Sequence, residues 1–281
     1  MASLYIVSTP IGNLGDITHR AVEVLSTVSR ILTEDTRRTA ILSRRYGFAA
    51  PRVSLHEHNE NARTEIVLKW LAAGEDLALV SDAGTPLISD PGARLVRAVL
   101  AAGHDVVPVP GPSAILAALV ASGIDAEPFA FYGFPPRTGG QRSAWLDRVA
   151  SLDVTTVFFE APGRLARLLH DLSERCAPDR AVTVARELTK VHETFVRGTL
   201  AEVTAYYENT SVRGEIVVVL SGASVTVSPA EDARALAREL LAQGRKPSGV
   251  ARELVRQIGL PRNQAYEIAL SVASEDGSEP P

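Results

Sequence analysis

The chain contains a single cysteine, Cys176, and no apolar run long enough to cross a membrane. One cysteine excludes a disulfide framework and excludes a zinc or iron–sulfur site built from cysteine ligands. The N-terminal segment also lacks the basic start and long apolar stretch of a secretory signal. We therefore expect a cytoplasmic protein that does not associate with membranes.

An excess of positive charge is also missing. The 29 Lys and Arg residues are outnumbered by 33 Asp and Glu residues, which gives a formal net charge of -4 over 281 residues. Proteins that coat nucleic acid through general attraction usually carry a net positive charge, so this balance argues against that class. The sequence contains neither G-x-x-x-x-G-K-[ST] nor G-x-G-x-x-G, which dismisses the P-loop and dinucleotide alternatives.

The sequence alternates short apolar, β-branched runs with longer segments of helical period, which is typical of an α/β fold. The pattern restarts after residue 122, so we expect one α/β domain over residues 1–122 and a second over residues 123–222. Residues 223–281 are expected to form three short helices and a polar tail from residue 274. The last two of these helices, joined by a turn that contains glycine, resemble a helix-turn-helix.

Three loops rich in glycine and proline follow predicted strands, at residues 9–16, 81–92 and 108–114. The carboxyl ends of parallel strands lie at one edge of a sheet, so we expect these loops to converge on a ligand cleft. Asp82 and Asp90 would place carboxylates there, able to accept hydrogen bonds from an amine or a ribose. Asp90 is also compatible with an ordinary N-cap of the following helix.

Seven short motifs then appear in order along nearly the whole chain. They are STPIGNL at residues 8–14, EDTR at 34–37, SDAGTP at 81–86, PGPS at 110–113, FEAPGRL at 159–165, ARELTK at 185–190 and RGE at 213–215. Together they resemble the ribosomal RNA small-subunit methyltransferase I family, a branch of the tetrapyrrole methylase superfamily. The resemblance implies two α/β domains with S-adenosylmethionine (AdoMet) in the cleft between them and a homodimer. It also implies 2′-O-methylation of a decoding-region cytidine in 16S rRNA, within the small ribosomal subunit.

The same resemblance implies which residues line the AdoMet pocket. From the first domain they are Pro10, Asp82, Gly84, Thr85, Ile88, Asp90, Ser113 and Ala114; from the second they are Phe159, Glu160, Leu188 and Gly214.

Methyl transfer to a hydroxyl also needs a group that accepts the hydroxyl proton. Five side chains are candidates for this catalytic role: Glu34, Asp35, Glu160, Glu187 and Lys190. Lys190 qualifies only if its pKa is depressed. The EDTR motif is equally compatible with a helix N-cap, because Asp and Thr are common before a helix.

Contact with RNA is expected from local charge. Residues 36–56 contain five arginines and no acid, a formal +5, and residues 245–262 contain five bases and one acid, a formal +4. A third patch is expected beside the glycines at 139–140. The expected RNA-binding residues are Arg37, Arg38, Arg44, Arg45, Arg137, Arg142, Arg245, Lys246, Arg252 and Arg256. Arginine suits phosphate and exposed bases, although charges on amphipathic helices often only face solvent.

Two other interpretations of the sequence remain open. One is a methylase of a tetrapyrrole or another small molecule from the same superfamily; the other is a non-enzymatic RNA-binding protein of ribosome assembly. A metal site is not expected, because His56 and His58 lack a further ligand at a suitable spacing.

Overall fold

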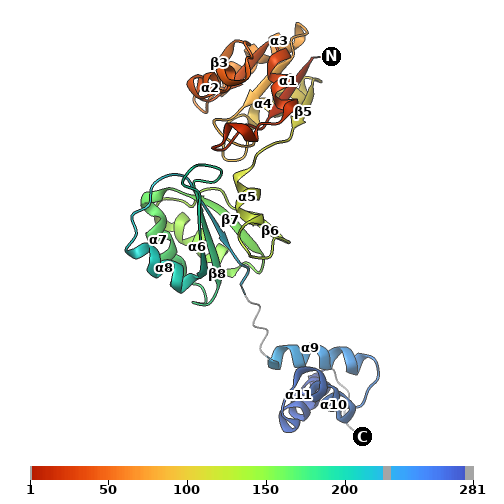
Figure 1. Ribbon diagram of the computed structural model, residues 1–281. Coiled ribbons are helices and arrows are strands. Elements are labelled where there is room, and N and C mark those ends of the chain that lie inside the picture. Colours follow the sequence, from red (N-terminus) through yellow and green to blue (C-terminus); the bar gives the residue numbers. More distant parts are fainter. Residues whose placement is uncertain (1, 224–228, 276–281) are drawn as a thin grey trace. The chain divides into compact units, whose positions relative to one another are not determined.

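A computed structural model describes residues 2–223 and 229–275 (Figure 1). The chain divides into two compact units, Met1–Ala223 and Ser224–Pro281. The first unit contains two five-stranded sheets, which occupy residues 3–109 and 129–220. The domain boundary expected near residue 123 lies between these sheets and inside the first unit, so it stays a prediction.

The first sheet is entirely parallel, with the strand order β3-β2-β4-β1-β5. Its strands are β1 (Ser3–Val7), β2 (Arg30–Thr33), β3 (Arg52–Ser54), β4 (Leu77–Val80) and β5 (Asp105–Val109). The helices that connect them are α1 (His19–Thr27), α2 (Thr36–Tyr46), α3 (Glu60–Ala72) and α4 (Ala93–Ala101). Because every pairing is parallel, the loops after these strands gather at one edge, as the alternating sequence pattern predicts.

Alternation along the strands gives the first sheet a core on each face. Leu77 and Leu79 of β4 pack with buried residues of α3 and α4, such as Val67 and Leu95. Their neighbours Ala78 and Val80 belong to a separate cluster with buried residues of α1 and α2. Both faces are therefore covered, which accounts for the continuous apolar run of β4.

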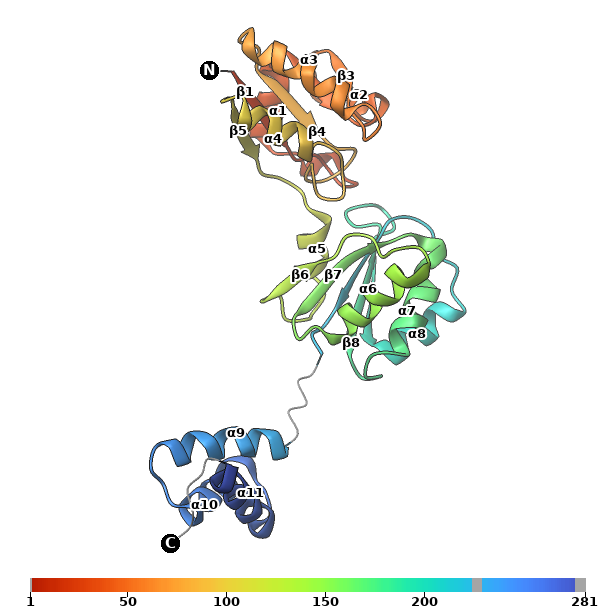
Figure 2. The ribbon, with the colours of Figure 1, turned by 180° about the vertical axis from the view of Figure 1, so that it is seen from behind.

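The second sheet is mixed, with the strand order β6-β7-β10-β8-β9. Its strands are β6 (Phe129–Phe131), β7 (Thr155–Glu160), β8 (Ala181–Arg186), β9 (Thr194–Thr199) and β10 (Ile216–Leu220). Only β6 pairs parallel to its neighbour; the other pairings are antiparallel. The helices α6 (Gly139–Ser151), α7 (Leu165–Ser173) and α8 (Leu200–Glu208) lie on one side of this sheet (Figure 2).

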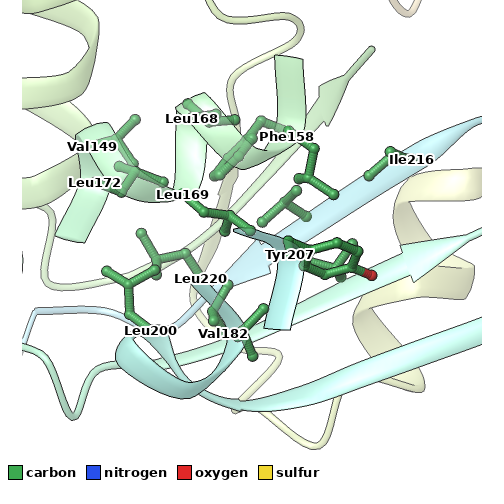
Figure 3. Packing of buried hydrophobic residues seen from close by; sticks show 14 of the residues in the cluster. Val149, Phe158, Leu168, Leu169, Leu172, Val182, Leu200, Tyr207, Ile216 and Leu220 are labelled. Atoms are coloured by element: carbon green, nitrogen blue, oxygen red, sulfur yellow. The ribbon is translucent and has the colours of Figure 1, made fainter. Parts of the chain in front are cut away.

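Buried aliphatic side chains and Phe158 join those three helices to the sheet (Figure 3). The opposite face is packed by α5 (Ala114–Val120), whose Ala118 and Leu119 cluster with Val157 and Val217 of the sheet. The helix that directly precedes the expected boundary therefore packs on the second sheet. This arrangement places the loop before α5 next to residues of both sheets.

The second unit consists of α9 (Pro229–Ala242), α10 (Pro247–Ile258) and α11 (Arg262–Glu275), each of which packs against the other two. They share a buried core that includes Leu254, Ile268 and Val272. The three predicted helices are confirmed. Of the predicted tail, residues 274 and 275 belong to α11, and residues 276–281 lie outside the described residues. No helix of the described residues is long and apolar enough to cross a membrane.

Candidate active site

Hydrogen bonds join the three glycine- and proline-rich loops of the first sheet. Thr9 and Gly84 exchange backbone hydrogen bonds of 2.9 and 3.0 Å. The Ser8 hydroxyl donates to Oγ1 of Thr85 at 3.2 Å, and the Thr85 hydroxyl donates to the carbonyl of Pro112 at 3.3 Å. The predicted convergence of these loops is therefore confirmed, and it follows from the adjacency of β4, β1 and β5 in the sheet.

The loop after β4 has an unusual backbone. Leu87 and Ser89 adopt left-handed φ angles of 75° and 67°, a conformation that side chains disfavour. Ile88 lies between them, and 42% of its surface is exposed. The N-cap of α4 is Gly92, with φ 122°, so the alternative interpretation of Asp90 as the N-cap is wrong. The loop thus holds Ile88 and Asp90 at the cleft rather than serving only as a helix entry.

A cavity of about 370 Å³ lies where the loops of the first sheet meet the second sheet. This volume is within the usual range for small-molecule sites. Eleven of the twelve predicted pocket residues line it: Asp82, Gly84, Thr85, Ile88, Asp90, Ser113, Ala114, Phe159, Glu160, Leu188 and Gly214. Pro10, the twelfth, is buried beside the cavity-lining Ile11 and is not part of the lining.

The acidic side chains on the first-sheet side influence one another. Oδ1 of Asp82 accepts a hydrogen bond from the backbone N–H of Asp35 at 3.0 Å, and its Oδ2 lies 3.4 Å from Nε of Arg38. Desolvation, followed by the charges of Glu34 and Asp82, raises the pKa of Asp90 to about 6. Desolvation and the charge of Asp82 likewise raise the pKa of Glu34. Glu34 and Asp90 therefore hold protons more readily than ordinary carboxylates.

Asp35 differs from these two carboxylates. It is the N-cap of α2, where its side chain accepts a hydrogen bond from the backbone N–H of Arg37 at 2.8 Å and pairs with the Arg37 guanidinium at 2.7 Å. The side-chain bond to Arg37 and then the backbone bond lower the pKa of Asp35 to about 2. The N-cap interpretation is confirmed, and so low a pKa makes Asp35 a weak proton acceptor.

Lys190 and Glu187 hold each other. Nζ of Lys190 lies 2.8 Å from Oε1 of Glu187 and 3.1 Å from Oε2 of Glu215. Burial acts to lower the pKa of Lys190, but its hydrogen bonds to the two carboxylates outweigh burial and raise the pKa overall. The condition for Lys190 as a base, a depressed pKa, is therefore not met. The bond to Lys190 lowers the pKa of Glu187.

Glu160 is the buried carboxylate of the cavity lining, with 2% of its surface exposed. Its Oε1 accepts hydrogen bonds from the Ala161 N–H and from Nε of Arg164, both at 2.7 Å. Its Oε2 is buried and has no hydrogen-bond partner among the described residues. A buried acceptor without a partner is rare in native proteins, so a ligand N–H or O–H would complete this site.

The loops of the two sheets also touch directly. The Asn13 N–H donates to Oγ1 of Thr189 at 3.0 Å. A Cβ on Gly12 would lie 2.9 Å from the Leu188 carbonyl oxygen and closer still to Lys190, so only glycine fits there. This contact brings Leu188 toward the cavity. The pattern at residues 12–13 and 188–190 carried no signal for the pairing, because it joins residues 176 positions apart.

The predicted basic residues fall into three situations. Arg37, Arg44, Arg45, Arg137, Arg245, Lys246, Arg252 and Arg256 are exposed. Arg38 is exposed too, but it lines the cavity and pairs with Asp82, a position that the charge pattern did not predict. Arg142 is 5% exposed, and its guanidinium pairs with Asp171 at 2.6 Å. The prediction that Arg142 belongs to a basic surface patch is wrong, because residues 139–151 form α6 and Arg142 lies on its buried face together with Leu146 and Val149.

Two residues outside the predicted set also make notable contacts. Phe134 is 54% exposed and lines the cavity, and its ring centroid lies 5.3 Å from that of Phe159. The only sequence signal for Phe134 was an aromatic residue shortly after a predicted strand. Glu60 is buried, and its Oε1 accepts hydrogen bonds from the N–H groups of Arg94 and Leu95. The described residues contain no cluster of three or more His, Cys, Asp or Glu suited to a metal ion.

The fold and this cleft define a methylase of a known class. Residues 3–204 match the tetrapyrrole (corrin/porphyrin) methylase family. The structure resembles a cobalt precorrin-4 methyltransferase, with a TM-score of 0.62 and 17% identity over 78% of this chain and 94% of that chain. It also resembles a uroporphyrin-III C-methyltransferase from Thermus thermophilus complexed with S-adenyl homocysteine, with a TM-score of 0.56 and 20% identity over 78% of this chain and 97% of that chain.

Relatives with higher sequence identity assign the chain to one family within this class. A ribosomal RNA small subunit methyltransferase I from Synechocystis is 44% identical over 98% of this chain and 100% of its own length. Proteins of the same name from Xylella fastidiosa, 44% identical over 94% of this chain and 97% of that protein, and from Bacillus subtilis, 45% identical over 80% and 76%, are similar. The chain belongs to the ribosomal RNA small subunit methyltransferase I family.

Proposed function

We propose that the protein is an AdoMet-dependent methyltransferase that modifies the 2′-hydroxyl of a decoding-region cytidine in 16S rRNA, within the small ribosomal subunit. The observation that supports this most strongly is the cleft itself. It combines three hydrogen-bonded loops of the first sheet with the buried carboxylate Glu160 of the second. A protein that only binds RNA has no need of such a cavity. A homodimer and a cytoplasmic location belong to the same proposal.

The residues of the cavity fit AdoMet in charge and shape. Asp82, Asp90 and the free Oε2 of Glu160 can accept hydrogen bonds from an amino group or a ribose. The left-handed backbone at Gly84 and Gly214, with φ 78° and 96°, lets the chain lie close to a ligand without a Cβ in the way. Ile88, Phe159 and Leu188 supply apolar surface suited to an adenine ring.

When bound, AdoMet supplies an electrophilic methyl group on a positively charged sulfur. The protein must then hold the RNA hydroxyl in line with that methyl group and accept its proton. Asp90 and Glu34 are the carboxylates whose pKa values are raised toward neutrality at this edge of the sheet, Asp90 to about 6. We assign proton acceptance to this pair, with Asp90 as the acceptor nearer the ligand because it lines the cavity.

RNA contact is proposed for the exposed arginines of α2. Arg44 and Arg45 lie in its last turn and are not part of the cavity lining. Arg38 connects the same helix to the cavity through Asp82, so a variant of Arg38 would disturb cofactor and RNA sites together. The double substitution Arg44→Glu with Arg45→Glu therefore tests RNA contact alone. It should impair RNA methylation and leave AdoMet binding unchanged.

The proposal is tested by incubating the protein with methyl-labelled AdoMet and one of three substrates: naked 16S rRNA, assembled small subunits, or a porphyrinoid precursor. Label in 16S rRNA or in the subunits supports it. Label in the porphyrinoid alone would favour the small-molecule methylase, and a failure to bind AdoMet in calorimetry would favour an RNA-binding protein without enzymatic activity. Asp82→Ala, which removes a cavity carboxylate and should weaken AdoMet binding, provides a matched control.

A further inference from the structure

The second unit contains a groove of its own. It lies between α10 and α11 and has a volume of about 680 Å³. Arg252 and Arg256 line it from α10, and Arg262 and Tyr266 line it from α11. The residues of each pair are four apart, so they project from the same face of their helix. The groove therefore collects side chains that are scattered in the sequence.

The charges at this groove favour an anion. Three arginines and one acid, Glu267, line it, a formal charge of +2. Arg256 pairs with Glu253, whereas Arg252 and Arg262 are exposed and form no ion pair within the described part of the chain. Arg252 and Arg262 stand on opposite helices, so two neighbouring phosphates of one strand could be held across the groove.

An aromatic ring lines the same groove as these charges. Tyr266 lines the groove on the same face of α11 as Arg262, and 47% of its surface is exposed. Its neighbour Asn263, which also lines the groove, offers both a donor and an acceptor for the edge of a base. An exposed ring that shares a groove with arginines is the combination that holds single-stranded nucleic acid, through base stacking and phosphate contact.

We propose that the groove between α10 and α11 binds a single-stranded segment of RNA, with one base stacked on Tyr266 and the adjoining phosphates held by Arg252 and Arg262. The choice of RNA rests on the proposed function. A helix-turn-helix reads DNA by inserting its second helix into the major groove, but the major groove of an RNA duplex is too deep and narrow for a helix. An unpaired segment can instead place its bases on the ring.

The test measures binding of the full chain to a fluorescent 12-nucleotide single-stranded RNA and to a duplex of the same sequence, by anisotropy. Tyr266→Ala should weaken single-strand binding about ten-fold, because stacking on an aromatic ring is lost. Tyr266→Phe should bind within about two-fold of the wild type, because the ring is retained. The matched control is Tyr206→Ala, which removes a tyrosine of similar exposure, 51%, from α8.

A second arm tests the arginines by salt dependence. Arg252→Ala with Arg262→Ala should reduce the slope of log affinity against log salt by about 1.4, since each phosphate contact on a single strand contributes about 0.7. Arg20→Ala with Arg97→Ala, which removes two exposed arginines of α1 and α4, should leave the slope unchanged. The arginine pair keeps the proposal testable if Tyr266→Ala fails to fold.

The outcomes separate this proposal from the proposed function. Asp82→Ala should weaken AdoMet binding and keep its affinity for the 12-nucleotide RNA, whereas Tyr266→Ala should keep AdoMet binding and weaken RNA binding. Equal binding of single-stranded RNA by the wild type, Tyr266→Ala and the arginine pair would overturn the groove assignment, whatever the methylation assay gives. Tighter binding to the duplex that Tyr266→Ala leaves unaffected would also overturn it.

Discussion

The backbone N–H of Asp35 donates a hydrogen bond of 3.0 Å to the carboxylate of Asp82. The bond joins the loop after β2 to the loop after β4, and Asp82 also lines the cavity. The carboxylate thus orders two loops, and an ion pair with Arg38 holds its second oxygen. The loops depend on one another through this side chain.

Substitution of Asp82 should therefore affect cofactor binding in a graded way. Asp82→Ala removes the acceptor for Asp35 and the partner of Arg38, so AdoMet affinity should fall about ten-fold or more. Asp82→Asn keeps an oxygen for the Asp35 N–H and should lose less. Calorimetric titration with AdoMet checks both variants. Equal affinity of wild type and Asp82→Ala would show that this carboxylate does not order the cleft.

The pKa of Asp90 predicts a pH dependence of methyl transfer. Its pKa of about 6 means that the carboxylate loses its proton as pH rises through that value. Single-turnover rates should therefore rise between about pH 5 and about pH 7. Asp90→Asn should remove this limb of the profile and lower the rate at neutral pH. An unchanged limb in Asp90→Asn would assign the titration to another group.

Deprotonation of Asp90 should also lower the free energy of unfolding of the free protein. The pKa of Asp90 is raised from its ordinary value of 3.8 to about 6, so the folded state binds this proton more tightly than the unfolded chain does. The resulting stabilisation is fully present below about pH 3.8 and is lost as pH rises through about 6. As pH rises between these two values, the Tm of Asp90→Asn should increase relative to the Tm of the wild type. A constant difference in Tm would contradict the raised pKa.

The loop at Gly12 packs tightly against residues 188–190 of the second sheet's loop. A Cβ there would lie 2.9 Å from the Leu188 carbonyl oxygen, so Gly12→Ala should push the two loops apart and weaken AdoMet binding. Gly140→Ala is the matched control, because a Cβ at that helical glycine meets no atom within 4 Å. The control should keep its affinity and gain about 0.5–1 kcal/mol of stability. Calorimetry and thermal unfolding measure the two effects.

Arg142 should behave as a residue of the interior. Arg142→Ala removes the buried partner of the Asp171 carboxylate and leaves it only the longer, 4.0 Å contact with the exposed Arg167, so it should lower the free energy of unfolding by about 3 kcal/mol. Arg137→Ala, which removes an exposed arginine, should leave stability within about 0.5 kcal/mol of the wild type. Urea denaturation compares the two variants. Similar stability of the two variants would indicate that Arg142 is exposed and would contradict its burial.

The sequence predicts the parts of this fold that depend on local pattern. The apolar run of β4, the helices with a clear stripe and the three glycine-rich loops follow from neighbouring residues, so their positions were expected. The strand β9 and the helix α6 have weaker local patterns, because β9 is a half-exposed edge strand and α6 begins with two glycines that suggest a loop. Arg142 was misplaced for the same reason.

The sequence predicts which residues line the candidate site, but not the pKa shifts of its ionisable side chains. Eleven cavity residues were expected because their motifs resemble a known family. The raised pKa of Asp90 and the place of Arg38 in the lining depend on contacts between distant loops, and the raised pKa of Lys190 depends in part on the distant Glu215. The low pKa of Asp35 comes instead from its near neighbour Arg37. Contacts between distant loops leave no periodic signal in a sequence.

The position of the transferred methyl group tests the central claim most directly. Small subunits labelled by the protein with methyl-labelled AdoMet would be deproteinised, and the 16S rRNA would be hydrolysed in alkali. A 2′-O-methyl group blocks cleavage at the next phosphodiester, because that cleavage requires the free 2′-hydroxyl. The account predicts label in one alkali-resistant dinucleotide that begins with cytidine. Label released as a single mononucleotide would place the methyl group on a base and contradict the account.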